Sequence, residues 1–153
     1  MRRRYLFSPQ GGLQTVPEKE IWYTSTNGQA IAPYNDGDLL IETNLYSGGK
    51  YVMRFSNVVN AIPDNMFNNL TGMKYLKSVA LPASVTKIGA GAFANCTKLT
   101  EVVFCGAPPA YSDSYPVSYR AAIYVPDTLV NDYMTDRYWS SYQNQIKPWS
   151  EHV

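Results

Sequence analysis

Few side chains in this sequence could carry out catalysis. The 153 residues include a single histidine, His152, next to last in the chain, and two cysteines, Cys96 and Cys105. Catalysis by a Ser/His/Asp or Cys/His set needs a base that is held in place, and we expect His152 to be mobile. One histidine and two dispersed cysteines also give no spacing typical of a zinc site. The sequence therefore predicts a non-catalytic protein without a metal or cofactor.

The two cysteines are expected to point in opposite directions. Cys96 stands where Leu70 stands in an internal repeat described below, which indicates a buried, small apolar side chain. Cys105 follows the inward-facing Phe104 and should point away from the core. We therefore expect no disulfide between them. The sequence also places no base or cation beside either thiol to make it reactive.

Three short motifs resemble functional sites but favour structural explanations. Asn35–Asp38 with Glu42 has the wrong ligand spacing for a calcium loop and predicts a turn. No Lys-Ser/Thr pair follows Gly89-Ala-Gly91, so its glycines predict a tight turn instead of a phosphate loop. Asn69-Leu-Thr71 and Asn95-Cys-Thr97 fit the N-glycosylation pattern. They occupy the same repeat position, which favours an Asn side chain that satisfies backbone groups in a bend.

Composition excludes several classes of partner. The chain has 13 basic and 12 acidic side chains, a net charge of +1, and therefore no basic field for nucleic acid or for a membrane surface. It has no apolar run long enough to span a membrane. The first seven residues are basic but lead into no apolar segment, so we expect no signal peptide. The length favours one domain, and we expect a monomer.

An internal repeat organises the middle of the chain. Val59, Ile62 and Phe67 recur as Val85, Ile88 and Phe93, each 26 residues later. After a three-residue insertion in the first copy, Leu76-x-x-Val79-x-Leu81 corresponds to Leu99-x-x-Val102-x-Phe104. Apolar residues with this spacing and period are typical of leucine-rich repeats. One such unit cannot bury its apolar face alone, so it must stack on its neighbours.

The repeat predicts four stacked rungs, at residues 53–55, 79–81, 102–104 and 123–125. Stacked neighbours form a small parallel sheet, and Pro82 and Pro126 end two of its strands. Residues 63–69 and 89–95 should each form one helical turn on the convex side, with Phe67 and Phe93 stacked inside. The third connection, 111–120, is either a degenerate repeat or a loop.

Both ends of the stack need a cap, because open ends leave strand groups unpaired. Residues 20–56 predict a β cap, with a hairpin at Asn27-Gly28, a return strand at 30–32, a strand at 39–46 and a turn at 47–49. A helix capped by Asp127 and a second helical piece, ended by Pro148, predict the closing cap. We expect Tyr138, Trp139 and Tyr142 to form its core.

The expected fold is therefore an α/β solenoid. It is a short, right-handed leucine-rich repeat coil with a parallel sheet of about four rungs, an N-terminal β-hairpin cap and a C-terminal helical cap. The expected organisation is a flexible tail at 1–18, one domain at 19–148 and a second tail at 149–153. Within the domain, 19–56 form the β cap, 57–109 hold two repeats, and 110–148 hold the degenerate repeat and the closing cap.

The repeat resembles that of BspA-like leucine-rich repeat proteins. The resemblance lies in residues 81–104, in Ile123-Tyr-Val-Pro126 and in the opening from Ile21 to Gly28. It implies a bacterial surface or secreted protein, since that family is found mostly in gut and oral anaerobes and is associated with adhesion. It brings no catalytic motif. The implied function is a non-catalytic protein-binding or adhesion module, whose partner is a host extracellular-matrix protein or a bacterial surface protein.

The candidate binding surface is the outward face of the rungs, which solenoids commonly use. It comprises Arg54, Ser78, Ala80, Glu101, Val103 and Tyr124. Two alternatives stay open. The domain could be a structural spacer with no ligand of its own, or an enzyme with a site in the loop at 106–120, lined by Asp113 and Arg120.

Overall fold

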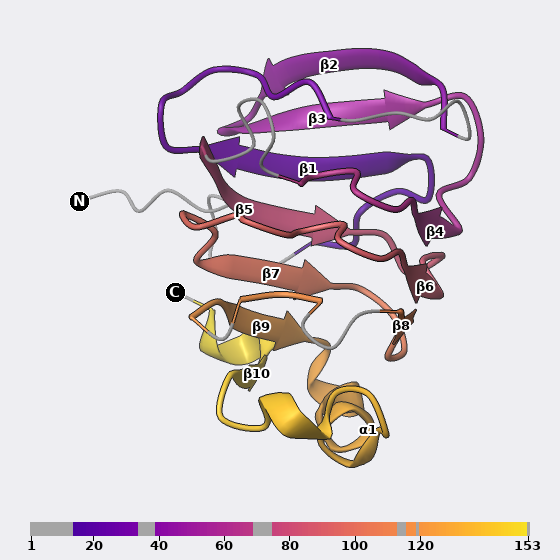
Figure 1. The fold of residues 1–153 in the computed structure, drawn as a ribbon, viewed down its shortest axis with the longest axis vertical. Helices are drawn as coiled ribbons and strands as arrows, with labels where there is room; N and C mark the ends of the chain where they lie inside the picture. Colours follow the sequence, from indigo (N-terminus) through magenta and orange to yellow (C-terminus); the bar gives the residue numbers. More distant parts are fainter. Residues whose placement is uncertain (1–13, 34–38, 69–74, 113–115, 119, 153) are drawn as a thin grey trace.

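The computed structural model describes residues 14–33, 39–68, 75–112, 116–118 and 120–152, and one mixed sheet dominates them (Figure 1). In this part of the chain the sheet has seven strands in the order β10-β9-β7-β5-β1-β3-β2. The strands are β1 (Glu20–Ser25), β2 (Ile41–Ser47), β3 (Lys50–Phe55), β5 (Leu76–Leu81), β7 (Glu101–Phe104), β9 (Ala122–Val125) and β10 (Ile146–Pro148). A second, three-stranded sheet contains β4 (Ala61–Ile62), β6 (Lys87–Ile88) and β8 (Ala110–Tyr111).

The repeats build the parallel half of the large sheet. Strands β5, β7 and β9 pair in parallel, with Val79 opposite Val102 and Val102 opposite Ile123. The short strands β4, β6 and β8 also pair in parallel, with Ile62 opposite Ile88 and Ile88 opposite Tyr111. Successive repeats therefore add one strand to each sheet. The third connection begins as a degenerate repeat, because β8 keeps the pairing although its sequence lacks the Ile…Phe pattern.

The first expected rung, 53–55, is not next to the rung at 79–81. It lies in β3, and β1 is inserted between β3 and β5, antiparallel to both. Strand β1 fits there because Ile21 and Tyr23 alternate toward the core and are fully buried. The parallel run of four strands is instead β5-β7-β9-β10, with β10 at the far edge of the sheet.

In the N-terminal cap the turn expected at 47–49 forms and joins two paired strands, whereas the hairpin expected at Asn27-Gly28 does not form. Strands β2 and β3 are joined by Gly48-Gly49, whose φ angles of 62° and 90° suit a two-residue turn. The expected return strand at 30–32 does not form. The backbone N–H of Ile31 instead donates to the hydroxyl of Tyr23 at 2.9 Å, and the Asn44 amide donates to the Ile31 carbonyl at 2.8 Å. The expected turn at Asn35–Asp38 lies outside the described residues.

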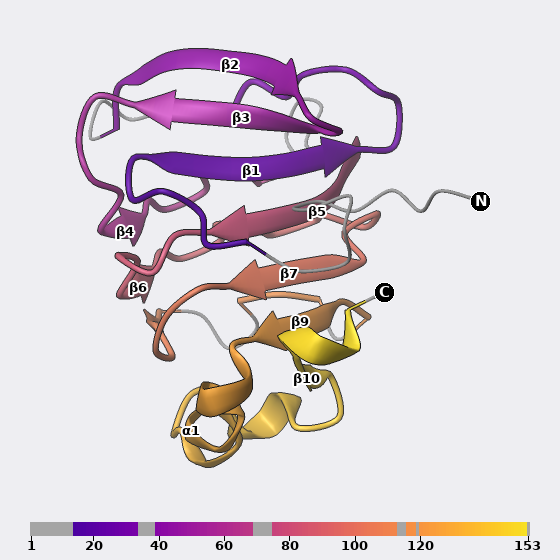
Figure 2. The same ribbon diagram turned by 180° about the vertical axis from the view of Figure 1, so that it is seen from behind.

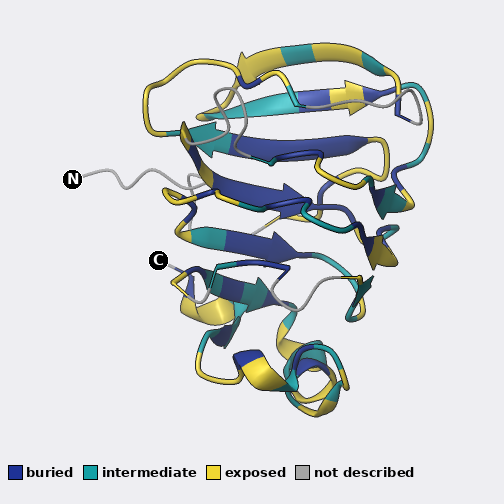
Figure 3. Cartoon of the chain, in the orientation of Figure 1, coloured by how far each residue is buried: buried dark blue, intermediate teal, exposed yellow. Residues whose placement is uncertain are grey.

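The main core is one cluster of buried apolar residues, and Figure 3 shows that β1, β5 and β7 are buried along most of their length. The rings of Phe67 and Phe93 lie parallel, with centroids 5.3 Å apart and 6° between their planes, which confirms the predicted stack. The convex connections form hydrogen-bonded turns instead of helices, with bonds such as Ala92 N–H to the Gly89 carbonyl. Asn65 and Gly91, at equivalent repeat positions, both have positive φ angles, of 61° and 67°.

The C-terminal cap is only partly helical. It contains α1 (Val130–Thr135) and the 3-10 turns η2 (Asp127–Leu129), η3 (Ser140–Tyr142) and η4 (Trp149–Glu151). Asp127 does not cap a helix; its carboxylate accepts a hydrogen bond from the backbone N–H of Ser150 at 3.0 Å. The expected second helical piece is replaced by η3 and strand β10. No helix in the described residues is long and apolar enough to cross a membrane.

The cap core contains the expected aromatic residues. Trp139 and Tyr142 are fully buried together with Tyr133, and Tyr138 packs against them partly buried. Their polar atoms bond to backbone carbonyls of the preceding layers: Trp139 Nε1 donates to Pro109 at 2.7 Å, and the Tyr142 hydroxyl donates to Val117 at 2.8 Å. These bonds let bulky aromatic side chains close the stack without burying an unpaired donor.

Two glycine substitutions test the repeat geometry. Gly28→Ala should cost about 1–2 kcal/mol, because φ is +70° but an added Cβ meets no atom within 4 Å. Gly89→Ala should cost about 1–3 kcal/mol without positive-φ strain, since its Cβ would lie 2.5 Å from the Asp64 backbone nitrogen in the neighbouring repeat. Urea unfolding of both variants measures the difference. Unchanged stability of Gly89→Ala would contradict close packing of the two turns.

Candidate functional site

The predicted outward residues lie on the sheet face opposite the main core. Ala80 and Val103 belong to a separate apolar cluster on that face. The strand registers place one residue of each strand in a single line, here called the outer row: Leu45, Val52, Trp22, Ala80, Val103, Tyr124 and Lys147. The predicted direction of Ala80, Val103 and Tyr124 is therefore correct. Trp22 occupies the position that was expected for Arg54.

The middle of the outer row is covered by Val16 and Trp149, which lie in segments near the two ends of the chain. Ala80 and Val103 are fully buried, and the neighbouring Ser78 is 6% exposed. Val16 and Trp149 pack against them, and Trp149 Nε1 donates a hydrogen bond to the Phe104 carbonyl at 3.1 Å. Figure 2 shows the segment that leads into β1 and the C-terminal η4 crossing this face. Ser78, Ala80 and Val103 are thus not accessible to a partner, contrary to the expectation of an open face.

The covering segments also change the expected tails. Val16, inside the flexible tail expected at 1–18, and Trp149 and His152, inside the tail expected at 149–153, pack on the sheet. The physical reason is the apolar character of the row: alanine and valine at outward positions gain free energy when another apolar side chain excludes water from them. Val16 and Trp149 supply those side chains.

His152 is held in place at one end of the covered face. Its Nε2 lies 2.8 Å from Glu101 Oε1, and its ring meets the Tyr124 ring edge-on with centroids 4.8 Å apart. The residue is only 9% exposed, so the expected mobility is wrong. Burial raises the pKa of the Tyr124 hydroxyl, and the charges of Glu101 and Glu151 raise it further. These contacts attach the C-terminal segment to β7 and β9.

Arg54 is separated from the other predicted residues by β1. It is exposed, and its Nη2 lies 2.9 Å from Glu20 Oε2. The other oxygen of Glu20 accepts a hydrogen bond from Trp22 Nε1 at 2.8 Å. Lys50 Nζ lies 4.3 Å from the centre of the Trp22 ring, and burial lowers the pKa of this amine. Lys50 and Arg54 therefore lie beside the buried Trp22, with the Glu20 carboxylate bonded to both Trp22 and Arg54.

Both cysteines are free, as expected, and both thiols are protonated at neutral pH. Burial raises the pKa of Cys96 to about 12 and that of Cys105 to about 11. The Cys96 Sγ donates to the Phe67 carbonyl at 2.9 Å, inside the main core. Cys105 lies on the covered face, beside Val16 and Trp149. Neither thiol is a nucleophile in this state.

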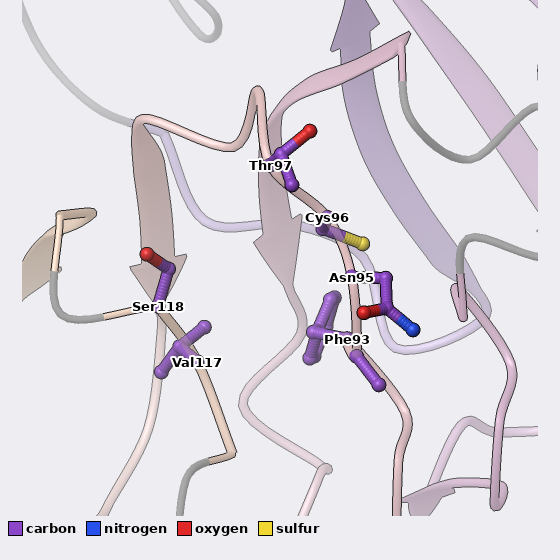
Figure 4. A pocket seen from close by; sticks show the side chains of 7 residues that line it. Phe93, Asn95, Cys96, Thr97, Val117 and Ser118 are labelled. Atoms are coloured by element: carbon purple, nitrogen blue, oxygen red, sulfur yellow. The ribbon is translucent and has the colours of Figure 1, made fainter.

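A cavity of about 330 Å³ opens on the convex side, beside the end of the Phe stack (Figure 4). It is lined by Phe93, Ala94, Asn95, Cys96, Thr97, Val117 and Ser118. None of these side chains is charged, and the cavity gathers no acid, base or activated nucleophile. Val117 comes from the degenerate third connection, where a valine faces the space beside Phe93.

Asn95 is explained by its backbone conformation. Its φ of 61° is left-handed, which asparagine tolerates better than most residues. Its side-chain amide lies 3.5 Å from the Asn68 side chain, in place of the expected bond to a backbone group. The equivalent Asn69 lies outside the described residues. Asn95 is exposed, and nothing in its surroundings requires a glycan.

The enzyme alternative gains no support from the loop at 106–120. Arg120 is exposed and does not line the cavity, and Asp113 lies outside the described residues. Within the part of the chain that the structure describes, no three His, Cys, Asp or Glu side chains are grouped so as to hold a metal ion.

Sequence reasoning missed Trp22, Val16 and Trp149. One signal was available: Trp22 lies between the inward Ile21 and Tyr23, so it must point outward, and a large outward apolar residue requires a cover. Ala80 and Val103 are also apolar and lie on the same face, so they indicate the same need for a cover. No comparable signal says which segments provide the cover.

Thiol labelling tests the covered face. With Trp149 in place, a disulfide exchange reagent at pH 8 should modify Cys105 very slowly, because the thiol is covered and its pKa of about 11 lies above that pH. Trp149→Ala should speed Cys105 labelling at least tenfold and leave Cys96 unchanged, since Cys96 lies in the other core. Rapid labelling of Cys105 in the unsubstituted protein would contradict the cover.

Comparison with known families identifies the type of repeat. Residues 47–110 match the family model described as "BspA type Leucine rich repeat region (6 copies)". The match includes the β2–β3 turn, both copies of the internal repeat and the start of β8. A search of curated proteins finds no match to the chain. Residues 47–110 thus form a leucine-rich repeat region of the BspA type.

Proposed function

We propose that the protein is a non-catalytic protein-binding module. The observation that supports it is the BspA-type repeat region at residues 47–110, because leucine-rich repeats typically serve as protein-interaction modules. The stacked strands and capped ends suit a short solenoid that presents a rigid surface. The sites described above offer no constellation of catalytic groups that favours an enzyme.

The proposed contact surface is the open end of the outer face. There the exposed Arg54 and the partly buried Lys50 and Val52 lie along β3, beside the buried Trp22. This surface differs from the one predicted from sequence, because Ser78, Ala80 and Val103 are buried. The Glu20 carboxylate compensates one of the two cations, so the surface keeps one net positive charge beside apolar side chains. Such a surface suits a partner segment that carries an acidic and an apolar side chain.

The proposed partner is a host extracellular-matrix protein or a protein of a bacterial surface, and the proposed location is the cell surface or the extracellular space. Both follow from the family resemblance. The competing proposal is a structural spacer, and it is favoured by the covered outer row: a face occupied by the chain's own ends leaves little sheet surface for a ligand.

Binding assays with charge-matched variants distinguish the two proposals. The purified protein would be applied to immobilised extracellular-matrix proteins and to bacterial surface proteins. Arg54→Ala should weaken binding about tenfold, corresponding to about 1.4 kcal/mol. Lys98→Ala, an exposed cation in a convex turn, serves as the control and should bind normally. Equal binding by all three proteins, or none by any, would favour the spacer.

A further inference from the structure

The two edges of the large sheet are built differently. Strand β10 has three residues, and Lys147 and Pro148 are two of them. A short edge strand with a lysine and a proline resists pairing with another chain. Strand β2 has seven residues, no lysine and no proline, and Glu42 is its one charged residue. Within the described residues no strand pairs with the outer side of β2.

Apolar side chains gather at the β2 edge. The large apolar side chains that are exposed in the described residues are Leu40 (63%), Leu45 (65%), Tyr46 (58%) and Tyr75 (37%). The first three lie on β2 or directly before it. Leu45 and Tyr46 point to opposite faces of the sheet, so both faces are apolar at this edge. An edge of this kind is either an aggregation hazard or an interface.

The backbone of β2 is suited to one more strand. Ser47 pairs with Lys50 across the two-residue turn, and the pairing continues as Tyr46 with Tyr51 and Leu45 with Val52. Successive residues of an antiparallel strand turn their N–H and C=O groups to opposite sides. The backbone N–H and C=O groups of Ser47 and Leu45 point toward β3. Those of Asn44 and Tyr46 therefore point outward.

We propose that β2 pairs antiparallel with β2 of a second copy of this chain, with Leu45 of one copy opposite Leu45 of the other. Asn44 of each copy then faces Tyr46 of the other, and these residues exchange their outward backbone hydrogen bonds. The two Leu45 side chains form a non-hydrogen-bonded pair, in which cross-strand side chains approach most closely. The outer rows of the two copies join into one line across both sheets.

The charges favour a second copy in this orientation. In the proposed register Glu42 lies opposite Gly48 of the other copy, so the two carboxylates are at opposite ends of the paired region. A parallel arrangement would place the Glu42 side chains next to each other, and like charges side by side on a sheet are destabilising. The interface is small, so the dimer should dissociate at about micromolar concentration. This proposal is independent of the proposed function and replaces the expectation of a monomer.

Sedimentation over a micromolar concentration series tests the proposal directly. The unsubstituted protein should shift from monomer to dimer as its concentration rises. Leu45→Lys should abolish the shift, because it places two ammonium groups opposite each other. Tyr75→Lys, an exposed aromatic residue outside β2, should dimerise normally. Thermal unfolding confirms that each variant is folded. A protein that stays monomeric at all concentrations would overturn the proposal. This holds also if the monomer binds a strand of another protein at the β2 edge.

Cysteine cross-linking tests the register. Leu45→Cys should form an intermolecular disulfide when oxidised glutathione accepts the two electrons and two protons, since the paired side chains face each other. Ser47→Cys should not form a disulfide, because in this register the position 47 side chains of the two copies are offset by four residues. Cys96 and Cys105 are buried or covered and do not compete. Equal cross-linking of the two variants would overturn the proposed register.

Discussion

Stacking of repeat layers is the constraint on which the structure depends. One leucine-rich unit has an apolar face that it cannot bury by itself. The parallel pairing of β5, β7 and β9 and the stacked rings of Phe67 and Phe93 bury that face layer by layer. The stack then needs an end on each side. Antiparallel strands close one end and a cluster of Tyr and Trp side chains closes the other.

The same constraint explains why the outward face is covered. A sheet has two faces, and only one of them packs on the core. In this chain the other face carries alanine, valine and tryptophan along the outer row, so it is too apolar to remain in water. Val16 and Trp149 cover it, and the His152–Glu101 contact attaches the C-terminal segment to it. The surface that remains open lies at β3 and β2, where the apolar row ends at an exposed Leu45.

Sequence periodicity predicted the part of the fold that repeats. It identified the strands at 79–81, 102–104 and 123–125, the Phe stack and the aromatic core of the closing cap. It could not predict the insertion of β1, because Met53-Arg54-Phe55 alternates inward and outward like a rung, and alternation does not specify which strand lies next to it. The turn expected at 47–49 does join two paired strands. The equally strong signal at Asn27-Gly28 does not, because the segment after it bonds to the side chains of Tyr23 and Asn44 instead of to a strand.

The candidate site was predicted in direction but not in accessibility. Direction follows from the alternation of side chains along a strand, whereas accessibility depends on distant segments such as residues 14–19 and 149–152. Amide hydrogen exchange tests the account most directly. At low protein concentration, the amides of Val102 and Val103, in a strand paired on both sides, should exchange slowest, and those of Asn44 and Tyr46 at the open edge should exchange much faster. Comparable rates at the two places would contradict a stack of repeats with β2 at its edge.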